Sequence, residues 1–150
     1  IAHKHNLILY GDVGTGKTHM ATALVAQACN QGIPARFFTT SALVMMLRRA
    51  KEQDHLDKEL ANLAKNQILV IDELGYLPID TEGARLLFQV IADAYEKRSL
   101  IITTNLEFSR WGTVFGDDNM AAAVIDRLIH HGRLLQFRGQ SHRVKNALMK

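Results

Sequence analysis

The chain has 150 residues, of which 47% are hydrophobic and 22% are charged, values typical of one globular domain rather than of a disordered or fibrous protein. Its longest apolar runs, such as residues 68–71, are far shorter than the roughly 20 residues that span a bilayer. The single cysteine, Cys29, excludes a disulfide framework and predicts a reducing, cytoplasmic location. Because the first residue is Ile1 rather than Met, we expect residues 1–150 to be one domain of a longer chain with a further N-terminal module.

The net charge of +3 is unevenly distributed along the chain. Residues 1–126 carry 12 basic and 15 acidic side chains, whereas residues 127–150 carry six basic side chains and no acidic one. The six are Arg127, Arg133, Arg138, Arg143, Lys145 and Lys150. A segment of one charge sign attracts polyanions, nucleic acid first, although a solvated terminus explains the same charge equally well.

In chain order, predicted strands alternate with predicted helices. Apolar runs predict strands at 7–10, 36–39, 68–72, 100–104 and 134–137, and helical spacing of apolar residues predicts helices at 17–31, 42–53, 56–65, 82–97 and 119–131. Ser41 is the expected N-cap of the second helix. The strand at 68–72 is continuously apolar, which predicts that both of its faces are covered. The pattern therefore indicates an α/β fold with a five-stranded parallel sheet between helices.

The segment 11–18 matches the phosphate-loop pattern GxxxxGK[ST] between a predicted strand and a predicted helix. Its glycines let several backbone N–H groups face a phosphate at a helix N-terminus. Lys17 would neutralise the β- and γ-phosphates of a nucleotide, and the Thr18 hydroxyl would ligate Mg²⁺. The alternative is a glycine-rich turn without a ligand. The predicted nucleotide contacts are Gly11, Asp12, Val13, Gly14, Thr15, Gly16, Lys17, Thr18 and His19.

Two acidic residues, Asp72 and Glu73, follow the third predicted strand. Open α/β sheets bind ligands at the carboxyl ends of their strands. Asp72 would hold Mg²⁺ through the water shell that this ion gives up reluctantly, and Glu73 would polarise a water molecule against the γ-phosphate. The alternative is a pair of acids that open a surface turn before Gly75.

Asn105 ends the fourth predicted strand, where its amide could bridge the attacking water and the γ-phosphate or simply cap the strand. Arg127 lies about 130° from the apolar stripe of its predicted helix, at 100° per residue, and so is expected to project away from its own core. It is either an ordinary surface arginine or an arginine finger for a neighbouring subunit.

Other conspicuous residues have structural interpretations. Trp111 is expected to anchor a loop to the core together with Phe108 and Phe115. His130 and His131 are adjacent on a predicted helix, so their side chains would diverge by about 100° and make a poor metal pair.

Taken together, these residues resemble AAA+ ATPases of the DnaC/IstB type. Beyond the nucleotide motifs, the resemblance covers essentially the whole chain, and Trp111 and the Asp-Arg-Leu segment favour IstB over DnaC. The segments that carry it are GKTHMA at 16–21, IDELGYLP at 71–78, FSRWG at 108–112, DRL at 126–128 and GQSHRVK at 139–145.

The resemblance implies an ATP- and Mg²⁺-dependent ATPase that assembles on DNA and stimulates a partner transposase in insertion-sequence transposition. It implies that hydrolysis occurs at a subunit interface, with Arg127 acting in trans between subunits packed head to tail, as rings or filaments. It also implies that the helix pair at 42–65 faces DNA, which makes Arg48, Arg49 and Lys51 the first candidates for backbone contacts.

The sequence also departs from the resemblance. Only thirteen residues follow Phe137, too few for the helical lid that completes a typical AAA+ module and carries a second arginine, so the role of Arg143 stays open. His142 stands where the IstB ending has Tyr. Two other functions remain: a DnaC-like loader of the replicative helicase, and a small-molecule kinase, which is disfavoured by Glu73 and Arg127 and by the lack of an arginine-rich lid.

Overall fold

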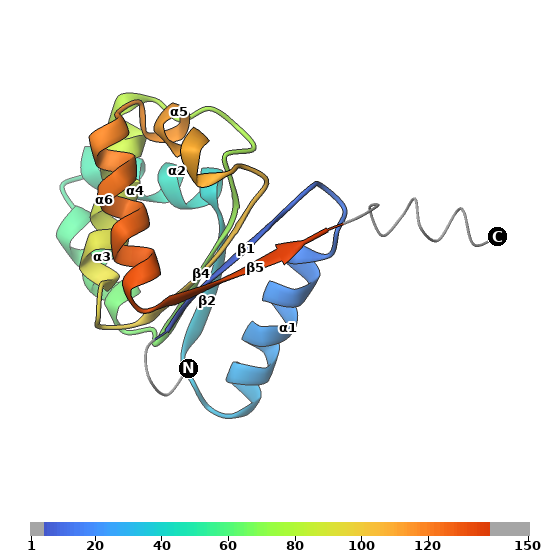
Figure 1. Cartoon of the computed structure of the whole chain (residues 1–150). Helices are drawn as coiled ribbons and strands as arrows, with labels where there is room; N and C mark the ends of the chain where they lie inside the picture. The colour runs from blue at the N-terminus through green and yellow to red at the C-terminus, as the bar shows by residue number, and fades with distance from the viewer. Residues whose placement is uncertain (1–4, 139–150) are drawn as a thin grey trace.

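A computed structural model describes residues 5–138, which form a single five-stranded sheet with helices on both faces (Figure 1). The strands are β1 (Asn6–Gly11), β2 (Ala35–Thr39), β3 (Ile68–Leu74), β4 (Ser99–Thr104) and β5 (Gly132–Phe137). All neighbouring strands are parallel, in the order β2-β3-β4-β1-β5. The predicted parallel α/β sheet is confirmed.

The helices cover the two faces of the sheet unequally. They are α1 (Lys17–Asn30), α2 (Thr40–Glu52), α3 (Leu56–Ala64), α4 (Thr81–Ala94), α5 (Trp111–Phe115) and α6 (Asp118–His130), with a 3₁₀ turn η1 (Phe108–Arg110). Figure 1 shows α1 on one side of the sheet and the other helices on the opposite side. The larger apolar core lies on that opposite side and includes Leu47, Leu87 and Trp111, whereas the smaller core lies against α1.

The central strands are almost completely buried. Every residue of β4 is buried, and in β3 only Glu73 is exposed. This confirms that the apolar strand at 68–72 is covered on both faces, which apolar runs of this kind require. The edge strand β5 is more open, since Leu134 is 50% exposed.

Two predicted boundaries are wrong for local reasons. Ser41 is not the N-cap of α2: the helix begins at Thr40 directly after β2, and the Thr39 hydroxyl accepts a hydrogen bond from the backbone N–H of Ala42 at 3.2 Å. The helix predicted to reach residue 97 ends at Ala94, because Tyr95 leaves the helical conformation with ψ 125° and Glu96 then adopts a left-handed one with φ 60°.

The segment predicted to be an anchored loop forms η1 and α5 instead. Trp111 is fully buried, and its indole Nε1–H donates a hydrogen bond to the carbonyl oxygen of Leu106 at 3.1 Å. The Phe108 ring meets the Trp111 ring edge-on at 5.1 Å. The prediction that Trp111 anchors this segment to the core is confirmed.

The end of α6 contradicts the prediction that the His130 and His131 side chains diverge. The helix ends at His130, and His131 leaves the helical conformation with φ −126° and ψ 38°. The two imidazole rings therefore lie 4.3 Å apart rather than diverging as successive helical side chains would.

The predictions about a lid, His142 and Arg143 fall outside the described residues. Within residues 5–138, no helix has the length and apolar character needed to cross a membrane.

Candidate nucleotide site

The phosphate loop connects the end of β1 to the start of α1. Gly14 and Gly16 have φ values of 81° and 96°, a left-handed conformation that glycine adopts readily. Gly16 is the N-cap of α1, and no side chain in the described part of the chain accepts a hydrogen bond from the first turn there. The first N–H groups of α1 are therefore available to an anion, and the helix dipole favours negative charge at this position.

Lys17 is the buried cation of the loop, with only 3% of its surface exposed. Its ammonium donates hydrogen bonds to the carbonyl oxygens of Gly11 and Asp12, both at 2.6 Å. Burial lowers the pKa of Lys17, and the charges of Asp12 and Asp72 partly offset that effect. The ammonium is thus held at the loop by carbonyl oxygens, where phosphate oxygens would be stronger, charged acceptors.

The structure brings Asp72 and Thr18 into contact, although 54 residues separate them in sequence. The Thr18 hydroxyl lies 3.0 and 3.2 Å from the two carboxylate oxygens of Asp72. Asp72 is 2% exposed, and a buried carboxylate requires hydrogen bonds to offset its loss of hydration. The Thr103 hydroxyl from β4 donates a further hydrogen bond to Asp72 Oδ1.

Glu73 owes its position to a β-bulge. The pairing of β3 with β4 shifts register between Ile71 and Leu74, and Glu73 has φ 63°, an unusual and strained conformation for a residue other than glycine. The bulge turns the Glu73 side chain out of the sheet, where it is exposed beside a buried Asp72. β3 therefore continues through Leu74 rather than ending at Asp72 as predicted.

A pocket of 390 Å³ opens beside Glu73, between α2 and the segment that follows β3. Tyr76 lies in its wall. The pKa of the Tyr76 phenol is raised, first by burial and then by the negative charges of Glu73 and Asp72. Tyr76 thus remains a neutral hydrogen-bonding group beside the two acids.

Asn105 follows β4, the strand that lies between β3 and β1. Its side-chain oxygen Oδ1 is buried and has no hydrogen-bond partner among residues 5–138. Buried polar atoms are nearly always paired in folded proteins. This oxygen is therefore an acceptor that a water molecule or a ligand would satisfy.

Two threonines were missed by the sequence reasoning. The Thr103 hydroxyl accepts the backbone N–H of Glu73 at 2.8 Å while donating to Asp72, and the Thr40 hydroxyl donates to the Asp72 carbonyl oxygen at 2.9 Å. Thr103 lies within the predicted strand at 100–104, where the apolar pattern gives it no separate role. A polar residue in a strand covered on both faces must find a partner, which is the signal that could have identified it.

Arg127 lies far from the phosphate loop of its own chain. The side-chain amide of Asn6 donates to the carbonyl oxygen of Leu128 at 3.3 Å, which places this part of α6 beside the start of β1. The loop follows the other end of β1, five residues and about 16 Å further along at the usual rise of a strand. The Arg127 side chain therefore lies near the amino ends of the strands, whereas the phosphate loop lies at their carboxyl ends.

The prediction that Arg127 projects clear of its own core is wrong in detail. Its side chain is half-buried, and its guanidinium donates a hydrogen bond to the Ala123 carbonyl oxygen at 3.1 Å. The guanidinium carbon also lies 5.5 Å from the centre of the Phe88 ring on α4, within the range of a cation–π contact. Both contacts are partly buried between α4 and α6.

The three residues predicted to contact DNA differ in whether their charge is already paired with an acidic side chain. The Arg48 guanidinium forms a bidentate ion pair with Asp80 at 2.7 and 2.9 Å, and these bonds, with the N–H of Gly83, lower the pKa of Asp80. Lys51 lies 3.5 Å from a carboxylate oxygen of Glu82. Arg49 is exposed, and no ion pair involves it in the described range.

The strand order, the phosphate loop after β1 and the acids on β3 define an ATP-binding P-loop domain of the AAA+ type. The fold is similar to the DnaC helicase loader, with a TM-score of 0.75, 25% identity, and coverage of 91% of this chain and 80% of that one. It is also similar to the AMPPCP-bound DnaA of Aquifex aeolicus, with a TM-score of 0.77, 18% identity, and coverage of 97% and 45%.

The chain belongs to the family described as IstB-like ATP binding protein, whose model matches residues 1–149. It is 41% identical over 150 residues to a protein of Bacillus thuringiensis subsp. berliner named as an ATP-binding protein of insertion sequence IS232, covering 100% of this chain and 60% of that one. It is 40% identical over 145 residues to the corresponding IS21 protein of Pseudomonas aeruginosa, covering 97% and 55%. The chain thus spans between half and two thirds of the length of these curated relatives.

The paired hydrogen bonds of Thr103 lead to a prediction about stability. Replacing Thr103 by Val should lower the free energy of unfolding by about 1–3 kcal/mol, because the Glu73 N–H loses its acceptor and the buried carboxylate loses a donor. Thr103→Ser keeps the hydroxyl and should retain most of that stability. Urea denaturation of the three proteins measures the difference, and a loss in Thr103→Ser as large as or larger than that in Thr103→Val would contradict the assignment of this stability to the hydroxyl.

Proposed function

We propose that this chain hydrolyses the ATP it binds, assembles on DNA, and stimulates the transposase of an insertion sequence. The observation that carries hydrolysis is the arrangement of polar groups at the carboxyl ends of neighbouring strands. The phosphate loop follows β1, Asn105 follows β4, and Asp72 and Glu73 lie on β3. The link to transposition is supported by relatives whose names refer to insertion sequences.

Thr18 and Asp72 are the residues that would hold Mg²⁺ with the nucleotide. Their oxygen atoms lie 3.0–3.2 Å apart, and Mg²⁺ prefers oxygen ligands while keeping several waters. Asp72 would act through those waters. The ion, when bound, supplies positive charge that offsets the charge of the phosphates.

Glu73 is the proposed general base. Its carboxylate is exposed at the site, where it can orient a water molecule and accept its proton. Asn105 would complete this arrangement, because its buried oxygen lacks a partner within the described structure and can accept a hydrogen bond from the same water. The Lys17 ammonium would leave its carbonyl acceptors and neutralise phosphate oxygens.

The second candidate function is helicase loading, which the similarity to the DnaC helicase loader favours. Both functions would use the same ATP site and differ in the partner protein. The neighbouring gene, for a transposase or for a replicative helicase, distinguishes them.

Phosphorylation of a small molecule is disfavoured, because Glu73 suits the activation of water and Arg127 suits stimulation between subunits. A screen of small-molecule phosphate acceptors tests this alternative.

Arg127 is proposed to act on the nucleotide of a neighbouring subunit. It lies near the amino ends of the strands, and its own phosphate loop lies at their carboxyl ends. Head-to-tail packing would therefore bring it toward the loop of the next copy. Among the described residues, a hydrogen bond to Ala123 and a cation–π contact with Phe88 hold the guanidinium in its present position. Interface formation can therefore redirect it at small cost.

The role of Glu73 is tested by Glu73→Gln, which preserves shape but removes the proton acceptor. ATP affinity should be retained, while turnover should fall by about 10²–10⁴-fold, the usual contribution of a general base. Calorimetry measures binding and phosphate release measures turnover. Lys17→Ala should instead lose ATP binding, and Glu52→Gln, an exposed glutamate on α2, is the matched control. A Glu73→Gln protein as active as its parent would assign Glu73 a structural role.

The trans role of Arg127 is tested by mixing variants. Arg127→Ala should bind ATP but hydrolyse it poorly, because an arginine finger contributes about 10³–10⁵-fold in other P-loop enzymes. Mixed with Lys17→Ala on DNA, it should recover part of the activity, since one variant offers an intact nucleotide site and the other an intact arginine.

Arg85→Ala, an exposed arginine of α4, serves as the control for lost charge in that experiment. Co-assembly without any recovery of hydrolysis would show that Arg127 does not act across the interface.

DNA binding is tested by comparing two neighbouring arginines. Arg49→Ala should weaken binding and reduce the salt dependence by about one unit of slope, as expected for one lost phosphate contact. Arg48→Ala should have the smaller effect, because its guanidinium is already paired with Asp80. Filter binding over a salt series measures both, and a larger effect at Arg48 would contradict the assignment.

A further inference from the structure

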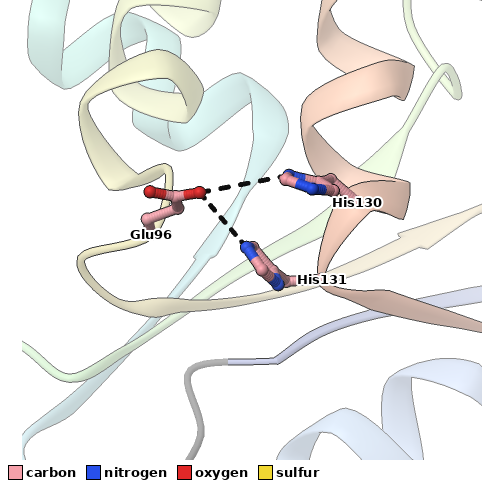
Figure 2. Close-up of side chains that lie close together, drawn as sticks. All are labelled: Glu96, His130 and His131. Carbon is pink, nitrogen blue, oxygen red and sulfur yellow. Dashed lines mark hydrogen bonds and ion pairs between the residues drawn. The ribbon is translucent and has the colours of Figure 1, made fainter.

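Three side chains that take no part in the proposed function converge where α4 and α6 end (Figure 2). Glu96 follows α4, His130 is the last residue of α6, and His131 leads into β5. One ligand atom from each lies within 4.8 Å of the others. We propose that Glu96, His130 and His131 form a binding site for a divalent transition-metal ion of the Zn²⁺ class.

The distances within this cluster are close to those of a metal site. Ligand atoms around a tetrahedral Zn²⁺ at 2.0–2.1 Å lie about 3.3 Å from one another. Glu96 Oε1 lies 3.2 Å from His131 Nε2 and 4.0 Å from His130 Nδ1. The first pair already has the required separation, and the second would close by about 0.7 Å, which a small side-chain rotation provides.

The donor set favours zinc over magnesium. Two neutral imidazoles and one carboxylate are a ligand set that Zn²⁺ uses, whereas Mg²⁺ prefers oxygen ligands only. The three side chains are between 42% and 59% exposed, so a hydrated ion can reach them. A fourth coordination position would be left for water or for a group from another molecule.

The backbone supports this convergence. Glu96 has φ 60°, a conformation that is uncommon outside glycine and is enriched at functional positions. Glu96 lies just after α4, where Tyr95 has already left the helical conformation, and its side chain points toward the end of α6, as Figure 2 shows. His131 has also left the helical conformation, with φ −126° and ψ 38°, which brings its ring beside that of His130.

Tyr95 is the neighbour with which a metal ion would compete. Its hydroxyl is hydrogen-bonded with His130 Nδ1, and its ring stacks on the His130 ring with centroids 5.9 Å apart. A metal at Nδ1 would take the lone pair that this hydrogen bond can use. Removing the hydroxyl should therefore leave metal affinity unchanged or increase it.

A metal ion here would join the ends of α4 and α6. Arg127 lies one helical turn before His130 and rests on Phe88 of α4, so the ion would hold the segment of α6 that carries this arginine. The proposal does not depend on the role of Arg127, because the binding of metal is measured without ATP.

The site is tested by calorimetric titration of Zn²⁺ into the chain in the Cys29→Ser background, since Cys29 is an exposed thiol. The parent should bind one ion that millimolar Mg²⁺ does not displace. His131→Ala and Glu96→Gln should each weaken Zn²⁺ binding by at least about tenfold, since loss of even an outer-shell partner costs 10–100-fold. His55→Ala, at the exposed N-cap of α3, is the matched control and should bind as the parent does.

Two further measurements identify the ligands. Co²⁺ in the parent should give the visible absorption of a four-coordinate ion, and the two cluster variants should lose it while keeping the parent's urea-unfolding midpoint in the absence of metal. Tyr95→Phe should bind Zn²⁺ at least as tightly as the parent. Absence of Zn²⁺ binding in the parent, or parent-like affinity in both cluster variants, would overturn the proposal.

Discussion

The candidate site depends on one constraint, the need to satisfy a carboxylate that is almost completely removed from water. Asp72 is 2% exposed, and a charge so buried is tolerated only when donors surround it. The donors come from α1 and β4, through Thr18 and Thr103. Satisfying this single group therefore fixes the distance between the phosphate loop, the acid-bearing strand and the strand between them.

Much of the architecture could be predicted from local patterns. Continuous apolar runs correctly indicate the five strands, and the glycine spacing of 11–18 identifies the loop, because both signals lie within a few neighbouring residues. The partners of Asp72 could not be predicted in the same way, since Thr103 is 31 residues away in sequence. Its role follows only once strand order and register are known.

The errors have a common physical origin. The sequence predicts that a helix continues wherever apolar spacing continues, but Glu96 and His131 leave the helical conformation through backbone angles that the spacing does not report. The same is true of the bulge at Glu73. All three residues lie where the chain leaves regular geometry, and two of them belong to the Glu96–His130–His131 cluster while the third belongs to the nucleotide site.

The carboxyl and amino ends of the parallel strands carry two different groups of residues. The carboxyl ends of β1, β3 and β4 carry the residues of the candidate nucleotide site. At the amino ends, Asn6 connects strands and helix: its side-chain oxygen accepts from the Leu100 N–H at 3.0 Å, and its amide donates to α6. This rigid connection keeps Arg127 and the Glu96–His130–His131 cluster on the side away from the phosphate loop.

The left-handed backbone of Glu73 also has a consequence for how this domain can change over time. Such a conformation costs about 1–3 kcal/mol for a residue with a side chain, and glycine would adopt it freely. Selection for thermal stability alone would therefore favour replacing the glutamate. A chain that keeps Glu73 gives up folding stability for an acid at that position, the usual trade-off between stability and activity in enzymes.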